Sequence, residues 1–395
     1  MELKLDARKW RQHRGLAKLL DALGASEGET RYVGGAVRDD LLGLPVNDVD
    51  LATRLRPDEV VERVQAAGLK AVPTGFEHGT VTAVSDGHPY EVTTLRRDVE
   101  TFGRRATVAF TDDWKEDAAR RDFTINALMA DPTKGEIFDY FGGLSDLEQR
   151  HVRFIGDPFE RIAEDHLRIL RFFRFHARFG MGDPDSAALD ACTARANDLM
   201  ALSRERIADE LLKLLSVADP APTVKIMLDR AILKPVIPAI EASAWRKLQA
   251  LVRAESEAGI AADPLRRLSA LLPRDPELAG AVATRLKLSN RARKRIGCAA
   301  EADIPDPQVT AYRVGVECAV DRLLLAGRSS EAGKIATWTP PGLPIGGGAL
   351  IKRGLVEGPV VSRTLREIED RWIAAGFPTG AAFDAIVADA LANSR

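Results

Sequence analysis

The chain has 395 residues, of which 45% are hydrophobic and 29% charged, and its formal net charge is −2. This length permits several structural units with sizeable cores. The near-neutral charge does not by itself indicate a nucleic-acid binder, so any such surface must be local. With no run of about 18 apolar residues and a charged start, MELKLDARKW, we expect no membrane span and a cytoplasmic location.

In chain order, Leu16, Leu19, Leu20 and Leu23 recur at helical spacing and predict a first helix over residues 8–24. Residues 30–145 alternate short strands, turns and helices. Within them VTAVSDGHPYEVTTLRR predicts a hairpin that turns at Ser85-Asp86-Gly87. After Asp157-Pro158 nearly every segment has a helical period broken by Pro and Gly. The fold class is therefore α+β, with a mixed α/β head followed by a long helical region.

The stretch RYVGGAVRDDLLGLPVNDVDLATR, residues 31–54, carries the first chemistry. Asp48 and Asp50 are two residues apart, and on a strand such side chains point to the same face. Two carboxylates on one face suit Mg²⁺, which also takes phosphate oxygens of a substrate. Gly34 and Gly35 allow close approach of the backbone to a phosphate, and the helix that follows supplies donors. These parts predict metal-assisted attack on a nucleoside triphosphate.

Asp-x-Asp and Gly-Gly are each common alone, but the whole string resembles the head signature of the nucleotidyltransferase superfamily. The form is that of bacterial tRNA nucleotidyltransferases (CCA-adding enzymes, class II) and their poly(A) polymerase relatives. The resemblance implies attack of an RNA 3′-hydroxyl on the α-phosphate of CTP or ATP, with pyrophosphate leaving and Mg²⁺ held by Asp48 and Asp50. It also places Arg38 in the triphosphate grip, although Arg38 and Asp39 would serve equally as a helix-surface pair.

Glu91, in Tyr90-Glu91-Val92, is the candidate for a third catalytic carboxylate because it lies on a neighbouring predicted strand between apolar residues. The alternative is a structural ion pair with Arg96 or Arg97. The polar segment RRDVETFGRRATVAFTDDW then predicts a mobile loop. It resembles the flexible loop that CCA-adding relatives need for the final A.

The segment ARRDFTINALM, residues 119–129, is the second match to the family. Arginine suits bidentate phosphate contact, and Asp122 could accept a hydrogen bond from a ribose hydroxyl. The resemblance assigns Arg121, Asp122 and Asn126 to nucleotide binding. A surface or capping role is the alternative for Asn126.

The helix predicted for ERIAEDHLRILRFFRFHARFG places Asp165 and Arg168 on one face, and Arg171 continues it. Cytosine and adenine both present an amine donor beside a ring-nitrogen acceptor, whereas uracil and guanine present a carbonyl beside an N–H. A carboxylate next to an arginine therefore matches CTP and ATP and opposes UTP and GTP. The segment resembles the family's E-D-x-x-R-x-x-R motif, which Glu164, Asp165, Arg168 and Arg171 fill. A solvated Glu164–Arg168 pair is the alternative.

The run RLKLSNRARKR, residues 285–295, has six basic residues and no acidic one. Ser289 could cap a helix that begins at Asn290. Basic runs are usually solvated faces, but the head implies a polynucleotide substrate. We therefore expect Arg291, Arg293, Lys294 and Arg295 to contact the tRNA backbone. The three cysteines, Cys192, Cys298 and Cys318, lack zinc-site spacing and are expected as buried thiols.

The family architecture implies a catalytic head (1–145), a neck that recognises the base (146–215), a body (216–290) and a tail that binds tRNA (291–395). The leading hypothesis is an enzyme that builds or repairs the CCA end of tRNA. A poly(A) polymerase, an enzyme adding only CC or only A, and an inactive RNA-binding protein are the alternatives. GFEHGTVTAV lacks the basic pair associated with the polymerase branch. No histidine follows His176, which excludes a C-terminal His-Asp phosphohydrolase site.

Overall fold

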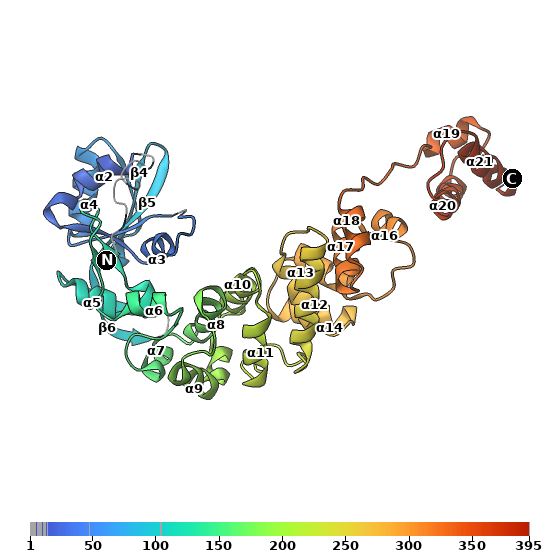
Figure 1. Cartoon of the computed structure of the whole chain (residues 1–395). Coiled ribbons are helices and arrows are strands. Elements are labelled where there is room, and N and C mark those ends of the chain that lie inside the picture. The colour runs from blue at the N-terminus through green and yellow to red at the C-terminus, as the bar shows by residue number, and fades with distance from the viewer. Residues whose placement is uncertain are drawn as a thin grey trace. The chain divides into compact units, whose positions relative to one another are not determined.

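The computed structural model describes residues 5, 10, 13, 15–46, 48–102 and 105–394 (Figure 1). Its contacts divide the chain into two compact units, Met1–Pro238 and Ala239–Arg395. The finer division at residues 145, 215 and 290 stays a prediction. Among the described residues, no helix has the length and apolar character needed to cross a membrane.

A seven-stranded mixed sheet forms the head of the first unit, in the order β3-β4-β5-β2-β1-β8-β9. All neighbours are antiparallel except β2 and β5, which run parallel with Leu51 opposite Val92. This parallel pair brings the strand that begins at Asp50 beside the strand that carries Glu91. The bounds are β1 Thr30–Val33, β2 Asp50–Thr53, β3 Lys70–Gly75, β4 Thr80–Ser85, β5 His88–Thr94, β8 Met129–Ala130 and β9 Ile137–Phe138.

Short helices surround this sheet, and α2 and α4 pack against its β3–β5 side (Figure 1). Of the helix predicted over residues 8–24, the described part forms α2, Leu16–Ala22, with Leu16, Leu19 and Leu20 buried. Most of residues 8–15 lie outside the described part. The bounds are α2 Leu16–Ala22, α3 Gly35–Leu41, α4 Pro57–Ala66, α5 Trp114–Ala119 and α6 Gly143–Glu148, with 3₁₀ turns η1 Ala25–Glu27, η2 Phe76–His78 and η3 Thr124–Asn126.

The predicted hairpin is confirmed, but the loop predicted after it is wrong. Strands β4 and β5 pair up to Ser85 and His88, and Asp86 and Gly87 take positive φ angles of 48° and 75° in the turn. The next segment forms a second antiparallel hairpin, β6 (Arg96–Phe102) and β7 (Arg105–Phe110). The alternating apolar and β-branched residues of ATVAF favour a strand more than their polar neighbours favour a loop.

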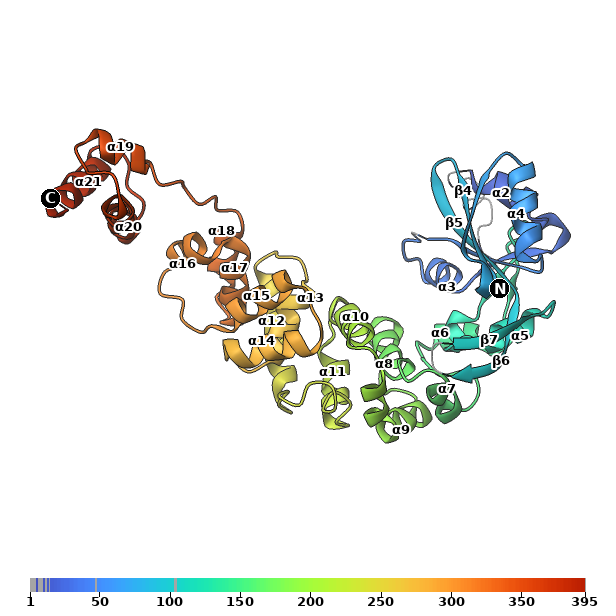
Figure 2. The same cartoon turned by 180° about the vertical axis from the view of Figure 1, so that it is seen from behind.

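The predicted helical region begins at Pro158 and is confirmed. Helix α8 lies beside α10 in both views of the chain (Figures 1 and 2). An aromatic cluster joins this neck to the head, since the ring of Phe123 lies 4.9 Å from that of Phe154 and 5.1 Å from that of Phe175. The bounds are α7 Pro158–Glu164, α8 Arg168–Phe179, α9 Ser186–Ala194, η4 Ala196–Ala201, α10 Arg204–Leu215 and α11 Ala221–Asp229.

Every secondary-structure element described in the second unit is a helix. Helices α12, α13, α16, α17 and α18 share one core that includes Leu251, Leu323 and Ile335, and α19–α21 pack around Trp372. The bounds are α12 Ala244–Glu257, α13 Pro264–Leu271, α14 Pro276–Arg285, α15 Asn290–Ala300, α16 Pro307–Val314, α17 Val316–Leu325, α18 Ser329–Ala336, α19 Gly347–Lys352, α20 Pro359–Ala374 and α21 Ala381–Asn393.

Several helices begin at the same dipeptide, Asp-Pro. The aspartate side chain accepts a backbone N–H of the first turn, and proline fills a position whose own N–H would lack a partner. This pattern starts α7, α13, α14 and α16. Ser289 caps α15 as predicted, because its Oγ accepts from the amide of Ala292 at 3.2 Å.

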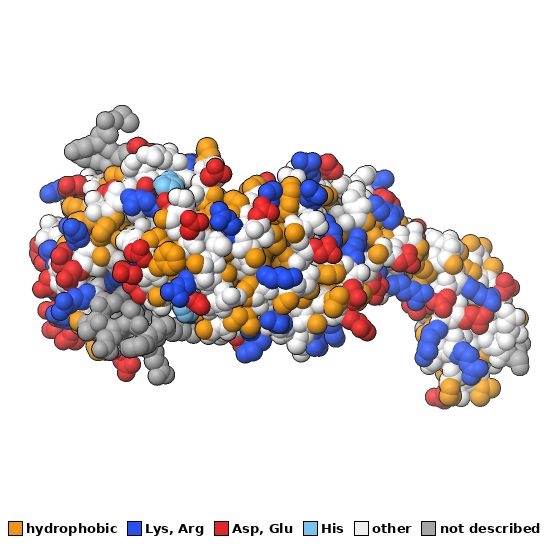
Figure 3. Space-filling model, turned by 90° about the horizontal axis from the view of Figure 1, so that it is seen from below, with side chains coloured by type: hydrophobic (Ala, Val, Ile, Leu, Met, Phe, Trp, Pro, Cys, Tyr) orange, Lys and Arg blue, Asp and Glu red, His pale blue; other side chains and the backbone are white. Residues whose placement is uncertain are grey.

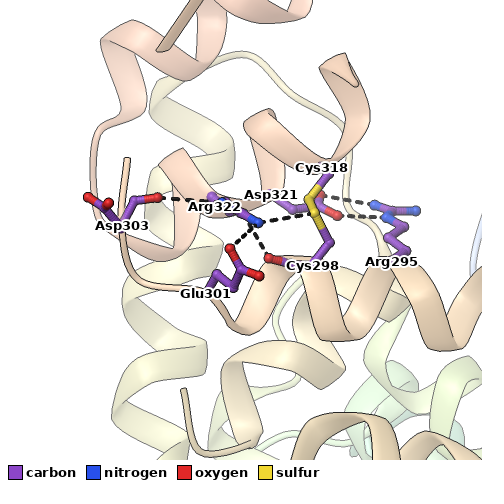
Figure 4. The surroundings of a disulfide bond; sticks show 7 residues. All are labelled: Arg295, Cys298, Glu301, Asp303, Cys318, Asp321 and Arg322. Atoms are coloured by element: carbon purple, nitrogen blue, oxygen red, sulfur yellow. Dashed lines mark hydrogen bonds and ion pairs between the residues drawn. A yellow bond between two sulfur atoms is a disulfide. The ribbon is translucent and has the colours of Figure 1, made fainter. Parts of the chain in front are cut away.

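A disulfide joins α15 to α17 through Cys298 and Cys318, and corrects the expectation of three thiols (Figure 4). The two cysteines are twenty residues apart, and they meet only because α15 and α17 pack against each other, which the sequence pattern does not indicate. Ion pairs flank the bond: Arg295 reaches Asp321 on one side, and Arg322 donates to Glu301 at 2.8 Å on the other. Cys192 is free and buried, and its burial raises the pKa of its thiol.

We expect the disulfide to stabilise the second unit by constraining its unfolded chain. For a loop of this length the effect is about 3 kcal/mol. Urea unfolding of the full chain with and without a phosphine reductant should show a loss of that size. Cys298→Ser is the control, since its unfolding should not respond to the reductant. A wild-type transition that the reductant leaves unchanged would contradict the bond.

Candidate active site

One cavity of about 830 Å³ in the first unit gathers most of the predicted site residues. Its lining comes from the ends of β1 and β2, the segment after α5, and helices α8 and α10. It includes Gly34, Gly35, Arg38, Asp48, Asp50, Arg121, Asp122, Asn126, Asp165, Arg168 and Arg171. Residues more than a hundred positions apart in the chain therefore face one space.

Asp48 and Asp50 both face this cavity, as the sequence predicted. Val49 and Leu51 between and after them are buried at 7% and 1% exposure, so the alternation turns both carboxylates outward. Asp48 precedes β2, which begins at Asp50. Burial raises the pKa of Asp50, and the charges of Glu91 and Asp48 add to that rise. Such crowding of negative charge is relieved by a bound cation.

Glu91, the candidate for a third metal ligand, lies farther from the cavity lining than Asp48 and Asp50 do. It lies on β5 beside β2, close enough to act on Asp50 electrostatically, but it is not among the residues that line the cavity. In the described part of the chain, no three Asp, Glu, His or Cys side chains form a metal-binding group. The residues that fit a divalent cation here are thus the pair Asp48 and Asp50.

Gly34 makes room for an arginine at the end of β1. It has φ +70°, and a Cβ built on it would lie 2.9 Å from Nη1 of Arg121. A side chain at this position would therefore displace the arginine as well as strain the backbone. Arg121 makes two long contacts with described residues, 3.4 Å to Asp117 and 3.5 Å to the carbonyl of Asn126. Its guanidinium is available to a phosphate in the cavity.

Arg38 is not the surface residue that its spacing allowed. Its side chain is buried, pairs with Asp39, and lies 4.1 Å above the ring of Phe179. Burial lowers the pKa of Arg38, and Asp39 opposes that shift. Arg38 also donates to Oδ1 of Asn126, whose Nδ2 donates to Asp122 at 2.9 Å. Asn126, which lies in the 3₁₀ turn η3, thus bridges Arg38, a candidate for binding the triphosphate, to Asp122, whose carboxylate pairs with the neck residue Arg171.

The ion pair of Asp122 with Arg171 links the head to helix α8. Asp122 is 8% exposed and accepts from Arg171, from the amide of Phe123 and from Asn126. Burial alone would raise the pKa of Asp122, but these donors lower it. Both carboxylate oxygens are engaged, so in this arrangement Asp122 orients Arg171.

The helix predicted across residues 160–179 is interrupted at Asp165. α7 ends at Glu164, Asp165 has extended backbone, and α8 begins at Arg168. The cause is local, because Oδ1 of Asp165 accepts from the amide of Leu167 at 3.1 Å, as a capping aspartate does. Asp165 and Arg168 still line the same cavity. Oδ2 of Asp165 also accepts from Arg206 at 2.7 Å.

The comparisons with known proteins agree with this geometry. A family profile described as "Poly A polymerase head domain" matches residues 30–153, and one described as "Probable RNA and SrmB- binding site of polymerase A" matches residues 183–243. The chain is 33% identical to the mitochondrial CCA tRNA nucleotidyltransferase 1 of Mus musculus, over 92% of this chain and 87% of that protein. It is 41% identical to the CCA-adding enzyme of Lacticaseibacillus paracasei over about half of each chain, 51% and 50%.

The chain belongs to the CCA tRNA nucleotidyltransferase family. Among solved structures, the CCA-adding enzyme of Bacillus stearothermophilus in complex with CTP is similar with a TM-score of 0.73. It is 26% identical and is matched over 96% of this chain and 98% of that one. The mixed head and helical remainder predicted from the sequence are confirmed by this similarity.

In this family member, Glu164 does not line the cavity with its motif partners. It accepts from Arg161 at 2.6 Å and from Arg168, so it reaches the cavity only through Arg168. Four residues that line the cavity were not predicted from the sequence: Arg174, Phe175, Arg206 and Lys213. No local spacing marked them, because Arg206 reaches Asp165 and Arg174 reaches Glu210 only in the folded chain.

The residues of the predicted RNA-binding run in the second unit differ in their exposure to solvent. Arg293 and Lys294 are exposed on α15, and Arg291 is 87% exposed with a 3.6 Å contact to Glu317. Arg295 departs from the prediction, because its guanidinium pairs with Asp321, Asp263 and Glu317 and its side chain is 10% exposed. On the face seen in Figure 3, Lys and Arg side chains are interspersed with Asp and Glu.

We expect Asp122→Asn to destabilise the first unit by about 1–3 kcal/mol at pH 7, because Arg171 loses its charged partner. The folded-state pKa of Asp122 is depressed, so this stabilisation is present above the unfolded pKa of about 3.9. It is lost as the pH falls through the folded value.

Unfolding free energies of wild type and variant should therefore differ most near neutral pH and converge below about pH 4. A difference that stays constant between pH 7 and pH 3.5 would contradict this role of the ion pair.

Proposed function

We propose that this chain adds or repairs the 3′-terminal CCA of tRNA from CTP and ATP. The supporting observation is the single cavity in which a carboxylate pair, a glycine–arginine phosphate site and an Asp/Arg face meet. Each part alone fits many proteins. Together they provide a metal site, a triphosphate site and a base-recognition site, which a polymerase that chooses a base without a nucleic-acid template requires.

Asp48 and Asp50 would hold Mg²⁺. The cation supplies charge stabilisation for the phosphoryl oxygens and for the attacking and leaving oxygens. Desolvation raises the pKa of Asp50, and the charges of Glu91 and Asp48 add to the rise, which supports a bound cation beside it. Glu91 remains a candidate for a third ligand, since its described position lets it act on Asp50 through charge.

A cytoplasmic location remains a proposal as well.

Arg121, beside Gly34, and Arg38, beside Gly35, are proposed to grip the triphosphate. The small residues let the phosphates approach the backbone, and arginine offers paired donors in a fixed plane. Asn126 fixes Arg38 through a hydrogen bond and contacts Asp122 with its amide nitrogen. The triphosphate grip and the neck are therefore oriented by one hydrogen-bonded chain.

Asp165 and Arg168 read the base. The carboxylate accepts the exocyclic amine of cytosine or adenine, and the guanidinium donates to the adjacent ring nitrogen. A carboxylate has about four lone-pair sites, so Asp165 can accept the amine while keeping its bonds to Leu167 and Arg206. Arg171 is oriented by Asp122 beside them.

The function is tested by removing one negative charge from the metal pair. Asp48→Asn or Asp50→Asn should lower addition of both C and A by about a thousandfold or more, since metal stabilisation of the transition state is worth several kcal/mol. Asp112→Asn is the control, an exposed head residue outside the cavity. Near-normal incorporation by either folded site variant would contradict the assignment.

Base selection provides an independent prediction. Asp165→Asn or Arg168→Gln should lower the preference for CTP over UTP, measured as a ratio of kcat/KM, by about 10–100-fold, the value of one or two polar bonds. The KM for tRNA should change little. Arg195→Gln is the matched control, because Arg195 and Asp198 form an exposed pair at the same three-residue spacing. Full discrimination by Asp165→Asn would leave Asp165 as a structural partner of Arg206 only.

The exposed part of the basic run is proposed to contact the tRNA backbone. Replacing Arg293 and Lys294 by Gln should raise the KM for tRNA and flatten its salt dependence by about 0.7–0.9 unit per lost contact. Arg295→Gln should instead destabilise the second unit, since it leaves Asp321 buried without this partner. The ratio of CTP to ATP use should stay constant in both. Unchanged tRNA affinity at low and high salt in the double variant would make the run a solvated face.

A further inference from the structure

The disulfide between Cys298 and Cys318 is not sealed inside a core, because one of its two cysteines is partly exposed. Cys298 lies near the end of α15 with part of its surface open to solvent, whereas Cys318 is buried at 6% exposure near the start of α17. Arg322 donates to Sγ of Cys298 at 3.3 Å and to its carbonyl at 2.8 Å (Figure 4). A cation beside a sulfur favours the thiolate, which is the form that exchanges.

We propose that this pair is a thiol–disulfide exchange site that is entered at Cys298, and that its redox state sets the affinity of α15 for tRNA. The exchange chemistry depends on the pair and its neighbours alone. The effect on tRNA rests on the proposed function, because it takes Arg293 and Lys294 as contacts to the tRNA backbone.

Exchange needs one accessible sulfur and one that can leave. In reduction, the thiolate of a small thiol attacks Sγ of Cys298, the bond to Cys318 breaks, and Cys318 leaves as a thiolate that takes up a proton. A second small thiolate then attacks the small-molecule sulfur of this mixed disulfide and releases Cys298. The pair has gained two electrons and two protons, and two small thiols have become one disulfide. Reoxidation by a small disulfide runs through the same mixed disulfide, with Cys298 as the attacking thiolate.

Arg322 is placed to hold the released thiolate of Cys298. Its side chain is 6% exposed, and it also donates to Glu301 at 2.8 Å and to the carbonyl of Asp303 at 3.4 Å. Glu301 is 53% exposed, so water screens its charge and it only partly neutralises the guanidinium. Stabilising the reduced form makes a disulfide easier to reduce. In the proposed cytoplasmic location, which is reducing, such a bond would open and close with the thiol supply.

One helix connects the pair to the proposed tRNA contacts. On α15, Cys298 follows Lys294 by four positions, and residues so spaced are neighbours on one face of a helix. The disulfide and the ion pair of Arg295 with Asp321 both hold α15 to α17. Reduction removes the covalent link and leaves the ion pair. Helix α15 then stays against α17 but loses more conformational freedom when Arg293 and Lys294 bind RNA, which weakens binding.

Mass spectrometry of the full chain in oxidised glutathione tests the exchange. Cys318→Ser leaves Cys298 without its partner and should gain one glutathione, whereas Cys298→Ser should gain none, because Cys318 is buried. Cys192 is the internal control, since it is free and buried and burial raises the pKa of its thiol, so it should stay unmodified in both variants. A glutathione on Cys318, or none on Cys298, would overturn the exchange site.

A redox titration tests the part given to Arg322. Arg322→Gln should raise the ratio of squared reduced glutathione to oxidised glutathione that opens half the bonds by about tenfold, which is roughly 1.4 kcal/mol of lost thiolate stabilisation. Glu301→Gln should lower that ratio by about twofold to threefold, because it removes the carboxylate that competes for Arg322. Glu301 is half exposed, so its variant changes the charge without disturbing the core. Shifts in one direction for both variants, or no shift in either, would contradict this role.

The effect on tRNA is measured as a KM in oxidising and reducing buffer. Reduction of the wild type should raise the KM for a tRNA lacking CCA by about threefold to tenfold and leave the KM for CTP unchanged. Cys298→Ser should show the raised value in both buffers. A wild-type KM for tRNA that is equal in the two buffers, with the bond shown to open, would overturn the control of tRNA affinity. Failure of the wild type to extend any tRNA in either buffer would instead contradict the proposed function, while mass spectrometry would still decide the exchange site.

Discussion

The ion pair between Asp122 and Arg171 is the interaction on which the candidate site depends. It joins a segment of the head to the first turns of helix α8. Its carboxylate is buried, and its guanidinium, 31% exposed, lies 5.4 Å from the ring of Phe175. A buried carboxylate without a charged partner is costly, so the head and α8 are held at one relative position. The carboxylate pair and the Asp165/Arg168 face thereby line one cavity.

This arrangement separates the chemistry from the choice of base. Asp48 and Asp50 belong to the sheet, whereas Asp165 and Arg168 belong to the junction of α7 and α8. Asn126 connects the two sides, because it contacts both Arg38 and Asp122. One set of hydrogen bonds thus runs from Arg38 through Asn126 and Asp122 to Arg171.

Features set by local spacing were predictable from the sequence, and those set by distant contacts were not. The alternation around Asp48 and Asp50, the β4–β5 hairpin and the Ser289 cap all depend on a few neighbouring residues. The break at Asp165, the ion pairs that occupy Arg295 and the disulfide of Cys298 with Cys318 depend on partners or capping bonds that periodicity does not reveal. Arg206 and Lys213 were missed for the same reason, since only folding brings α10 to the cavity.

The central claim is that one cavity selects C and A and adds them in a fixed number. It is tested most directly by giving the purified protein a tRNA that ends before the CCA, with each nucleoside triphosphate alone and then CTP with ATP. The account predicts two additions with CTP, a third only when ATP is also present, and none with UTP or GTP. Long runs of A, or incorporation of U or G at comparable rates, would contradict it.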